Sequence, residues 1–241
     1  MAVGFFKKSL ILVAIALVSI SSSLKVLFLV FQRLRDQDAA ASKIIHHWAR
    51  NILKILQVNY TVLNSHNFSF VSDRPYIIMS NHCSHVDIPL IYEAFAHDKI
   101  GMIAKKELFK IPLFGRGMKL GGCLSIDRDN MRQALKDMDI AKKRLLSGVR
   151  LWIAPEGTRS LTGELGVLKK GGFKIAVGAK AIIIPVVIIG SNRILPAKTM
   201  DFNLEEKVEV HIGQPIDTLD YDTKDLQLLM EKVSRSLFIN S

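Results

Sequence analysis

The sequence predicts an α/β protein with a mixed, largely parallel sheet flanked by helices and preceded by an N-terminal helical membrane anchor. Two patterns lead to this fold class. The first 31 residues are dominated by apolar side chains and carry three charges, Lys7, Lys8 and Lys25. From residue 75 onward, short apolar runs alternate with longer segments of helical spacing, as strands and their covering helices do. We therefore expect membrane-anchoring helices over residues 1–58 and an α/β domain over residues 59–241.

Length and charge narrow the class of protein. A chain of 241 residues suits one domain with an anchor. Its 33 Lys and Arg against 22 Asp and Glu give a formal charge of +11, and the mean hydropathy is +0.24. An excess of positive charge favours an anionic partner, and lipid headgroups and nucleic acid are the two candidates. A solvated basic surface is the alternative.

The apolar N-terminal segment spans residues 9–31, with Lys25 as its one charge. A spanning helix needs about 20 such residues. A cleaved signal peptide has the same basic start and apolar core, but it would not need the second apolar run, residues 26–31. Basic residues flank the segment on both sides, so the positive-inside rule does not fix its orientation. A single span and an in-plane anchor both remain open.

Residues 41–58 predict an amphipathic helix, because apolar residues recur at helical spacing with Lys43, Arg50 and Lys54 among them. Such a helix can lie on a membrane surface or dock on the core of the domain. The two cysteines, Cys83 and Cys123, are too few for a disulfide framework and fit a reducing compartment. We therefore expect a membrane-associated protein whose α/β domain faces the cytoplasm.

The remaining elements follow from periodicity. Residues 76–79, 100–104, 149–154 and 182–189 predict buried strands, and the alternating residues 207–212 predict an edge strand. Residues 131–146 and 225–238 predict helices. Their expected core-facing positions are Leu135, Met138, Ile140, Ala141 and Leu145 in the first helix, and Leu226, Leu229, Val233 and Leu237 in the second.

The first reactive loop, Asn81-His82-Cys83-Ser84-His85-Val86-Asp87, follows the strand at residues 76–79. Loops after strands often carry chemistry. An imidazole can act as a general base when a carboxylate fixes its tautomer, and the five-residue offset lets His82 and Asp87 meet across a turn. His85 is the alternative base, and Cys83 or Ser84 could instead act as a nucleophile. Asp87 could also have a purely structural role, in which it only caps the next helix.

Two further loops are rich in cations. Between residues 105 and 128, basic side chains lie among glycines and can approach a phosphate closely; they are Lys105, Lys106, Arg116, Lys119 and Arg128. The apolar residues between them are mostly aliphatic, which suits lipid better than nucleic acid. In Pro155-Glu156-Gly157-Thr158-Arg159, the Arg159 fork can bind a phosphate. Glu156 can accept from a substrate hydroxyl or orient Arg159, or the two can form a surface pair of little energetic value.

Together these loops resemble the 1-acylglycerol-3-phosphate O-acyltransferase family of glycerolipid acyltransferases. The family's N-H-x4-D, G-x3-I-D-R and P-E-G-T-R motifs match Asn81 to Asp87, Gly122 to Arg128 and Pro155 to Arg159. Its apolar run with a proline matches Ile184-Pro185-Val186. All four motifs occur in the family's order within residues 76–190. The chain departs from the family at Leu168, where a Phe is common, and in its unusual Cys83-Ser84-His85 filling of the first motif.

The resemblance implies a role for each matching residue. His82 would be the general base and Asp87 its orienting partner. The phosphorylated acceptor would be bound by Glu156, Gly157, Thr158 and Arg159, with Arg128 and Lys105 on the phosphate, and Pro185 would shape the acyl site.

The resemblance also implies the reaction. A fatty acyl group would pass from acyl-CoA or acyl carrier protein to the free hydroxyl of 1-acylglycerol 3-phosphate (lysophosphatidic acid), giving phosphatidic acid. No bound cofactor, metal or nucleic acid is expected, and the bilayer is the expected partner. Three alternatives remain: another lysophospholipid or glycerolipid as acceptor, a hydrolase using Cys83 or Ser84, and a non-catalytic protein that binds anionic lipid.

Overall fold

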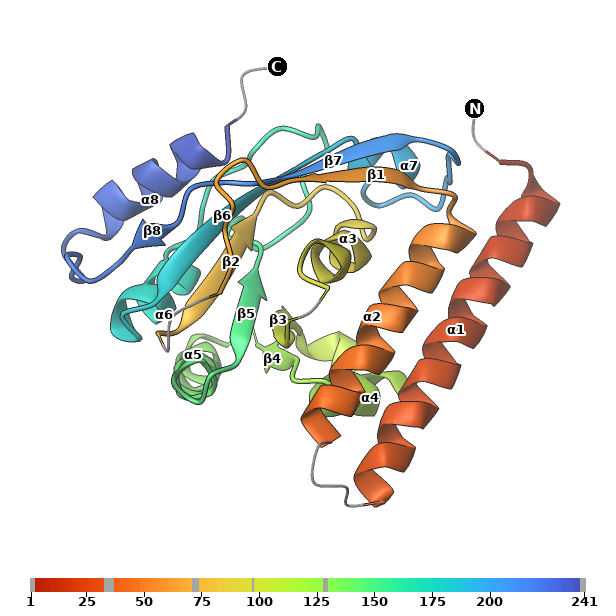
Figure 1. The fold of residues 1–241 in the computed structure, drawn as a ribbon, viewed down its shortest axis with the longest axis horizontal. Coiled ribbons are helices and arrows are strands. Elements are labelled where there is room, and N and C mark those ends of the chain that lie inside the picture. The colour runs from red at the N-terminus through yellow and green to blue at the C-terminus, as the bar shows by residue number, and fades with distance from the viewer. Residues whose placement is uncertain (1–2, 33–36, 71–73, 97, 128–129, 239–241) are drawn as a thin grey trace.

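A single mixed sheet with helices on both faces forms the centre of the molecule (Figure 1). The computed structural model describes residues 3–32, 37–70, 74–96, 98–127 and 130–238. The strands are β1 (Asn59–Leu63), β2 (Tyr76–Ser80), β3 (Ile100–Lys105), β4 (Leu124–Ile126), β5 (Arg150–Ile153), β6 (Ile182–Ile189), β7 (Lys207–Ile212) and β8 (Ile216–Asp217). The helices are α1 (Phe5–Phe31), α2 (Gln37–Ile55), α3 (Asp87–Ala94), η1 (Lys106–Lys110), α4 (Phe114–Leu120), α5 (Met131–Leu146), α6 (Lys170–Gly178), α7 (Ser191–Ile194) and α8 (Leu226–Ser236).

The strand order is β1-β7-β6-β2-β5-β3-β4, and β8 pairs with β6. The five strands from β6 to β4 run parallel, whereas β7 and β8 are antiparallel to β6. This arrangement confirms the predicted mixed, largely parallel sheet.

The prediction that residues 207–212 form an edge strand is wrong. β7 lies between β6 and β1, and β1 takes the edge through a parallel register from Asn59↔Lys207 to Leu63↔His211. The alternation in β7 comes from its buried Val208, Val210 and Ile212. Period-two alternation reports one half-buried face, and it does not report whether another strand pairs along the edge.

Two apolar cores cover the two faces of the sheet. Successive side chains of a strand point to opposite faces. Accordingly, Ile78 and Ile184 join the core beneath α2 and α3, while Ile77 and Ile183 join the core beneath α5, α6 and α8. All five residues of β2 are buried. Burial on both faces explains why β2 and β6 are continuous apolar runs in the sequence.

The helix predicted over residues 131–146 has the same bounds as α5, but two of its expected core positions are exposed. Ala141 and Leu145 are buried, and Met138 packs against them, whereas Leu135 is 51% and Ile140 49% exposed. At 3.6 residues per turn, a stripe through Met138, Ala141 and Leu145 leaves Ile140 on the opposite side of the helix. All four core residues predicted for the last helix are buried, three of them in α8 and Leu237 directly after it.

The first two helices pack side by side at one edge of the molecule (Figure 1). Over Phe5–Leu29, α1 is long and apolar enough to cross a membrane by length and composition. The predicted amphipathic helix is α2, and its apolar face docks on the core through the buried residues Ala49, Ile52, Leu53 and Leu56. Of its two proposed roles, docking on the domain is therefore the one observed.

Candidate active site

The carboxyl ends of four neighbouring parallel strands bring the predicted loops together. β2, β5, β3 and β4 are adjacent and parallel, so residues 81–87, residues 155–159 and Asp127 follow strands at one edge of the sheet, and Lys105 ends β3 at the same edge. Neighbouring strands lie about 4.8 Å apart, which puts the ends of β2 and β3 about 10 Å from each other. Arg128, predicted to hold the phosphate, lies outside the described residues.

His82 and Asp87 meet as the five-residue offset predicts. The His82 Nδ1 atom lies 2.8 Å from Asp87 Oδ2. A carboxylate accepts from a protonated Nδ1, so this contact assigns the tautomer in which Nε2 is free to take a proton. The Asp87 side chain has no exposed surface, and that of His82 is 15% exposed. The pair therefore combines a fixed carboxylate with an accessible imidazole.

Asp87 also shapes the turn that carries His82. The same Oδ2 atom accepts the backbone N–H groups of Cys83 at 2.8 Å and Ser84 at 2.9 Å. These amides precede α3, whose N-cap residue Val86 makes no side-chain capping bond. Asp87, as the first residue of α3, also has a favourable position for a negative charge at the positive end of the helix dipole. Its contacts thus go beyond capping.

Trp152, on the neighbouring strand β5, supports the imidazole and was missed at the sequence level. The rings of Trp152 and His82 are edge-to-face, with centroids 5.7 Å apart. The Trp152 indole N–H donates to Ser80 Oγ at 2.9 Å, which fixes the indole. Its one visible sign in the sequence is an indole within the mostly aliphatic run that leads into Pro155.

Asn81 ties the same turn to β6. Its side-chain amide donates to the Ile188 carbonyl and accepts from the Ile188 N–H, both at 2.8 Å. The side chain thus pairs with β6 as a strand backbone would. This pairing accounts structurally for the asparagine that precedes His82.

His85 is the weaker candidate base. The residue is exposed at the surface. Even so, the pKa of His85 is lowered to about 4, mainly because its ring is partly desolvated and further because of the nearby positive charge of Arg159 and of His82. A general base works best when its pKa lies near the working pH. The carboxylate partner belongs to His82, and we assign the base to His82 as a prediction.

Cys83 and Ser84 are engaged elsewhere and are not arranged as nucleophiles. The Cys83 thiol faces the Gly163 carbonyl at 3.6 Å, and burial, reinforced by the Asp87 and Glu156 charges, raises its pKa to about 12. The thiolate is the reactive form of cysteine. Ser84 Oγ is buried and donates to the Leu195 carbonyl at 2.9 Å.

We expect Cys83→Ala to keep the acyl transfer that the resemblance implies within about fivefold of the unchanged protein, because a thiol with a raised pKa contributes no nucleophile. The measurement is the initial rate of acyl transfer by purified protein. A loss of more than about 100-fold, with the protein still folded, would restore the cysteine-nucleophile alternative.

Glu156 lies behind the site. Its side chain is buried, and the residue is 4% exposed. Oε1 accepts from the His82 N–H at 3.0 Å, and Oε2 accepts from the Gly166 N–H at 2.8 Å. Burial raises the pKa of Glu156, while these two N–H groups oppose that rise. The expected contact with a substrate hydroxyl and the expected pairing with Arg159 are both unsupported by this geometry.

The rest of the P-E-G-T-R loop carries the cations. Gly157 has φ +72°, and a Cβ there would lie 3.1 Å from Lys169 Cδ, so glycine lets the Lys169 stem cross the turn. Arg159 is half-buried and forms no hydrogen bond or ion pair with the part of the chain that the structure describes. Thr158 and Lys105 are exposed. The cationic groups are thus available to an anion at this edge of the sheet.

The three other basic residues predicted to be able to approach a phosphate are placed differently. Lys106 pairs with Asp127 at 2.7 Å, and the Asp127 N–H donates to Asp137 at 2.9 Å. This network joins the ends of β3 and β4, so Lys106 and Asp127 act structurally. Arg116 and Lys119 are exposed on α4.

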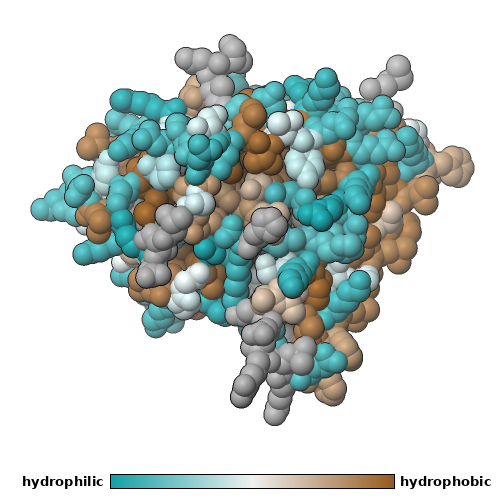
Figure 2. Space-filling view, in the orientation of Figure 1, coloured by the Kyte–Doolittle hydropathy of each residue, from teal (hydrophilic) through white to brown (hydrophobic). Residues whose placement is uncertain are grey.

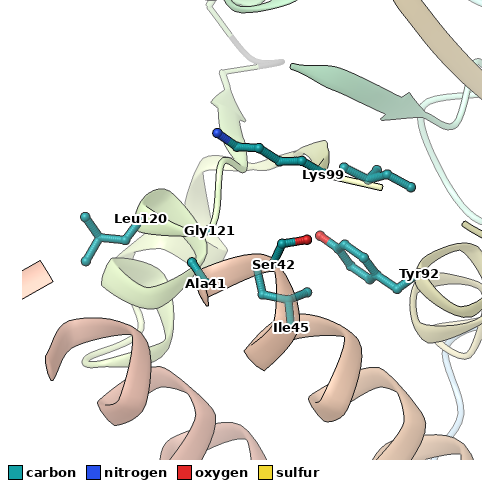
Figure 3. A pocket seen from close by; sticks show the side chains of 8 residues that line it. Ala41, Ser42, Ile45, Tyr92, Lys99, Leu120 and Gly121 are labelled. Carbon is teal, nitrogen blue, oxygen red and sulfur yellow. The ribbon is translucent and has the colours of Figure 1, made fainter. Parts of the chain in front are cut away.

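A crevice where α2, α3, β3 and α4 meet is too small to hold a substrate (Figure 3). Ser42 and Tyr92 extend toward it from facing helices, and it offers about 10 Å³, at most the room of one water molecule. Within the described ranges, no group of three or more His, Cys, Asp or Glu side chains is arranged to hold a metal ion.

Comparison with known proteins agrees with this arrangement. Residues 59–189 match the family model described as Acyltransferase. The chain is 28% identical over 204 residues to the mouse 1-acyl-sn-glycerol-3-phosphate acyltransferase alpha, covering 84% of this chain and 70% of the mouse protein. It is 33% identical over 166 residues to the 1-acyl-sn-glycerol-3-phosphate acyltransferase of Saccharomyces cerevisiae, covering 68% of this chain and 54% of the yeast protein.

A solved structure shares the whole fold. The crystal structure of the 1-acyl-sn-glycerophosphate (LPA) acyltransferase PlsC from Thermotoga maritima superposes with a TM-score of 0.75 at 25% identity, covering 95% of each chain. The family match includes β1 to β6 and with them His82, Asp87 and the P-E-G-T-R loop. The protein therefore belongs to the acyltransferase family.

Proposed function

We propose that this protein transfers a fatty acyl group from an acyl thioester to the free hydroxyl of 1-acylglycerol 3-phosphate, producing phosphatidic acid. The observation that carries the proposal is the His82–Asp87 pair at 2.8 Å, on the turn next to the loop that carries Arg159. Relatives from mouse and yeast bear the name of this activity. The family, the base and the cationic loop all agree with it.

The mechanism follows from the tautomer. Asp87 holds the Nδ1–H, so His82 Nε2 takes the proton of the acceptor hydroxyl as its oxygen attacks the thioester carbonyl. The new C–O bond forms, the C–S bond breaks, and the imidazolium returns its proton to the departing thiolate. The buried Asp87 carboxylate stabilises the imidazolium in between. Direct attack needs no acyl-enzyme.

Arg159, Lys105 and Lys169 would bind the acceptor phosphate, with Arg128 as a further predicted ligand. A guanidinium binds phosphate through two parallel N–H groups, whereas an ammonium is a point charge. We place Gly157 and Thr158 beside the same phosphate. The proposed step needs no bound cofactor, because the imidazole supplies the base and the thioester supplies the activated acyl group.

Arg159→Lys is expected to raise the KM for lysophosphatidic acid by about 10-fold or more while kcat falls less, because one contact of the fork is lost in both the ground and the transition state. Steady-state kinetics at varied acceptor concentration give both constants. An unchanged KM would remove Arg159 from the phosphate site.

We further propose that α1 lies in the plane of the membrane. The helix is tied to the rest of the molecule at its start and near its middle: the N–H of Val3, just before α1, donates to the Phe202 carbonyl at 2.9 Å, and Trp48 of α2 donates to Ser19 Oγ at 3.0 Å. Its outer face is an exposed apolar stripe of Phe6, Leu10, Val13, Leu17, Ile20, Leu24 and Phe28. Figure 2 shows hydrophobic side chains along the edge that α1 forms in Figure 1. An upright span would break the inner contacts.

Replacing Leu10, Leu17 and Leu24 by glutamine is expected to lower partitioning onto anionic vesicles by at least about 100-fold, since each buried leucine contributes about 1.5–3 kcal/mol. Vesicle co-sedimentation measures the effect. The control is Leu219→Gln with Leu228→Gln, two exposed leucines that lie just before and within α8. Equal partitioning of both variants would contradict the in-plane interface.

We place the protein on the cytoplasmic side of its membrane, where the bilayer supplies lysophosphatidic acid and the aqueous phase supplies acyl-CoA or acyl carrier protein. To test the function, membranes containing the protein are incubated with a labelled acyl donor and a panel of lysolipids that differ in headgroup. We expect lysophosphatidic acid to be esterified fastest. Preference for a lysolipid without a terminal phosphate would refute the proposed acceptor, and lack of transfer to every lysolipid would refute the function.

A further inference from the structure

The structure places a buried carboxylate, Glu156, between the two loops of the site. We propose that Glu156 is a positioning residue that holds the His82 base in register with the phosphate-binding loop, and that it is not a ligand of the acceptor. This inference rests on the proposed function. It differs from the role that the sequence motif implies for this glutamate.

The backbone of His82 is held from both sides by the P-E-G-T-R loop. Its N–H donates to Glu156 Oε1 at 3.0 Å, and its carbonyl accepts from the Ser160 N–H at 2.7 Å. Arg159 lies between these two contacts in the sequence. The position of the imidazole is therefore linked directly to the segment that carries the phosphate-binding guanidinium.

The second carboxylate oxygen closes the same loop on itself. Glu156 Oε2 accepts from the Gly166 N–H at 2.8 Å, and a Cβ at Gly166 would lie 2.9 Å from that oxygen. Glycine therefore permits the close approach. The Lys169 N–H donates to the Pro155 carbonyl at 2.8 Å and completes the closure. One carboxylate thus joins three backbone segments: its own turn, the His82 turn and the far end of the loop.

Only a carboxylate satisfies both of these amides in full. Its two oxygens accept two N–H donors, whereas a glutamine of the same size turns an NH₂ group toward one of them. The N–H that faces this NH₂ group would then lose its acceptor in the protein. The imidazole has two supports, the Asp87 contact at the ring and the Glu156 contact at the backbone. Loss of the second would displace the base without removing any atom that touches the acceptor.

The test compares Glu156→Gln with Glu164→Gln in the full chain, using 1-oleoylglycerol 3-phosphate and oleoyl-CoA in vesicles. Glu164 is an exposed glutamate in the same loop, so the two variants lose the same negative charge. We expect Glu156→Gln to lower kcat per folded molecule by about 30-fold or more with KM for the acceptor within about twofold, as small misplacements of a catalytic group do. Glu164→Gln should change neither. A 10-fold rise in KM with kcat retained, or no change at all, would overturn the proposal.

Gly166→Ala provides a second variant that leaves the glutamate in place. It should lower kcat in the same way, because its methyl group displaces Oε2. Combined with Glu156→Gln, it should add little, since both changes break one contact. Fully additive losses would contradict the shared role. If Glu156→Gln fails to fold, the kcat and KM of Gly166→Ala decide the question.

Hydrogen exchange tests the contact independently of activity. The His82 amide should be protected in the unchanged protein and in Glu164→Gln, and should exchange at least about 10-fold faster in Glu156→Gln. Unchanged protection would overturn the inference even if the enzyme is active. If the unchanged protein acylates no lysolipid, the proposed function is refuted. The exchange rate of the His82 amide then still tests the contact between Glu156 and His82.

Discussion

Replacing His82 by alanine is expected to lower kcat for acyl transfer by at least about 10³-fold, with little change in KM for lysophosphatidic acid. A hydroxyl is a poor nucleophile near neutral pH and must lose its proton as it attacks. His82 is the imidazole whose Nδ1 is held by a carboxylate, at 2.8 Å from Asp87. Steady-state kinetics of the folded variant measure the loss.

His85→Ala is the matched control for this prediction. It removes an imidazole three residues away whose pKa of about 4 makes it a weak base. We expect a loss of less than about 10-fold. Equal losses in the two variants would mean that the assignment of the base to His82 is wrong. Retained activity in His82→Ala would favour a non-catalytic histidine and would undo the proposed mechanism.

Asp87→Asn is expected to lower kcat by about 10²–10⁴-fold and also to destabilise the fold. An asparagine can present its NH₂ group to the ring and thereby favour the wrong tautomer. The same oxygen of Asp87 accepts the buried amides of Cys83 and Ser84, so both donors lose their acceptor, at a cost of about 1–3 kcal/mol each. Kinetics measure the first effect and thermal unfolding the second.

The two changes should not add in the double variant. If Asp87 acts through His82, then His82→Ala with Asp87→Asn should be no slower than His82→Ala alone. A double variant slower by the product of the two losses would show that the carboxylate acts separately on the reaction. The stability loss of Asp87→Asn should persist in the double variant, because the amides of Cys83 and Ser84 remain.

Local patterns in the sequence were sufficient for most of the elements and for the pair at the centre of the site. Apolar runs predicted β2 and β6 because both strands are buried on both faces. Helical spacing predicted α5 and α8 with their bounds close to those observed. The His82–Asp87 contact was also predictable, since its two residues lie within one turn.

Contacts between segments distant in the sequence were not predictable in this way. Alternation in β7 indicated a half-buried strand but could not reveal that β1 pairs with its outer edge. The ring of Trp152 and the carboxylate of Glu156 reach His82 across strands that are about 70 residues apart in the chain. No local spacing encodes such a neighbour.

By itself, the sequence determined the fold class, the order of the motifs and the chemistry available to them, because each depends on periodicity or on residues within a few positions of one another. Only the tertiary structure decided the strand order, the docking of α2 and the placement of Glu156 behind the base. The physical reason is that a side chain bonds whichever backbone the fold brings beside it. A buried carboxylate accepts the nearest unpaired amides, and these belong here to His82 and Gly166.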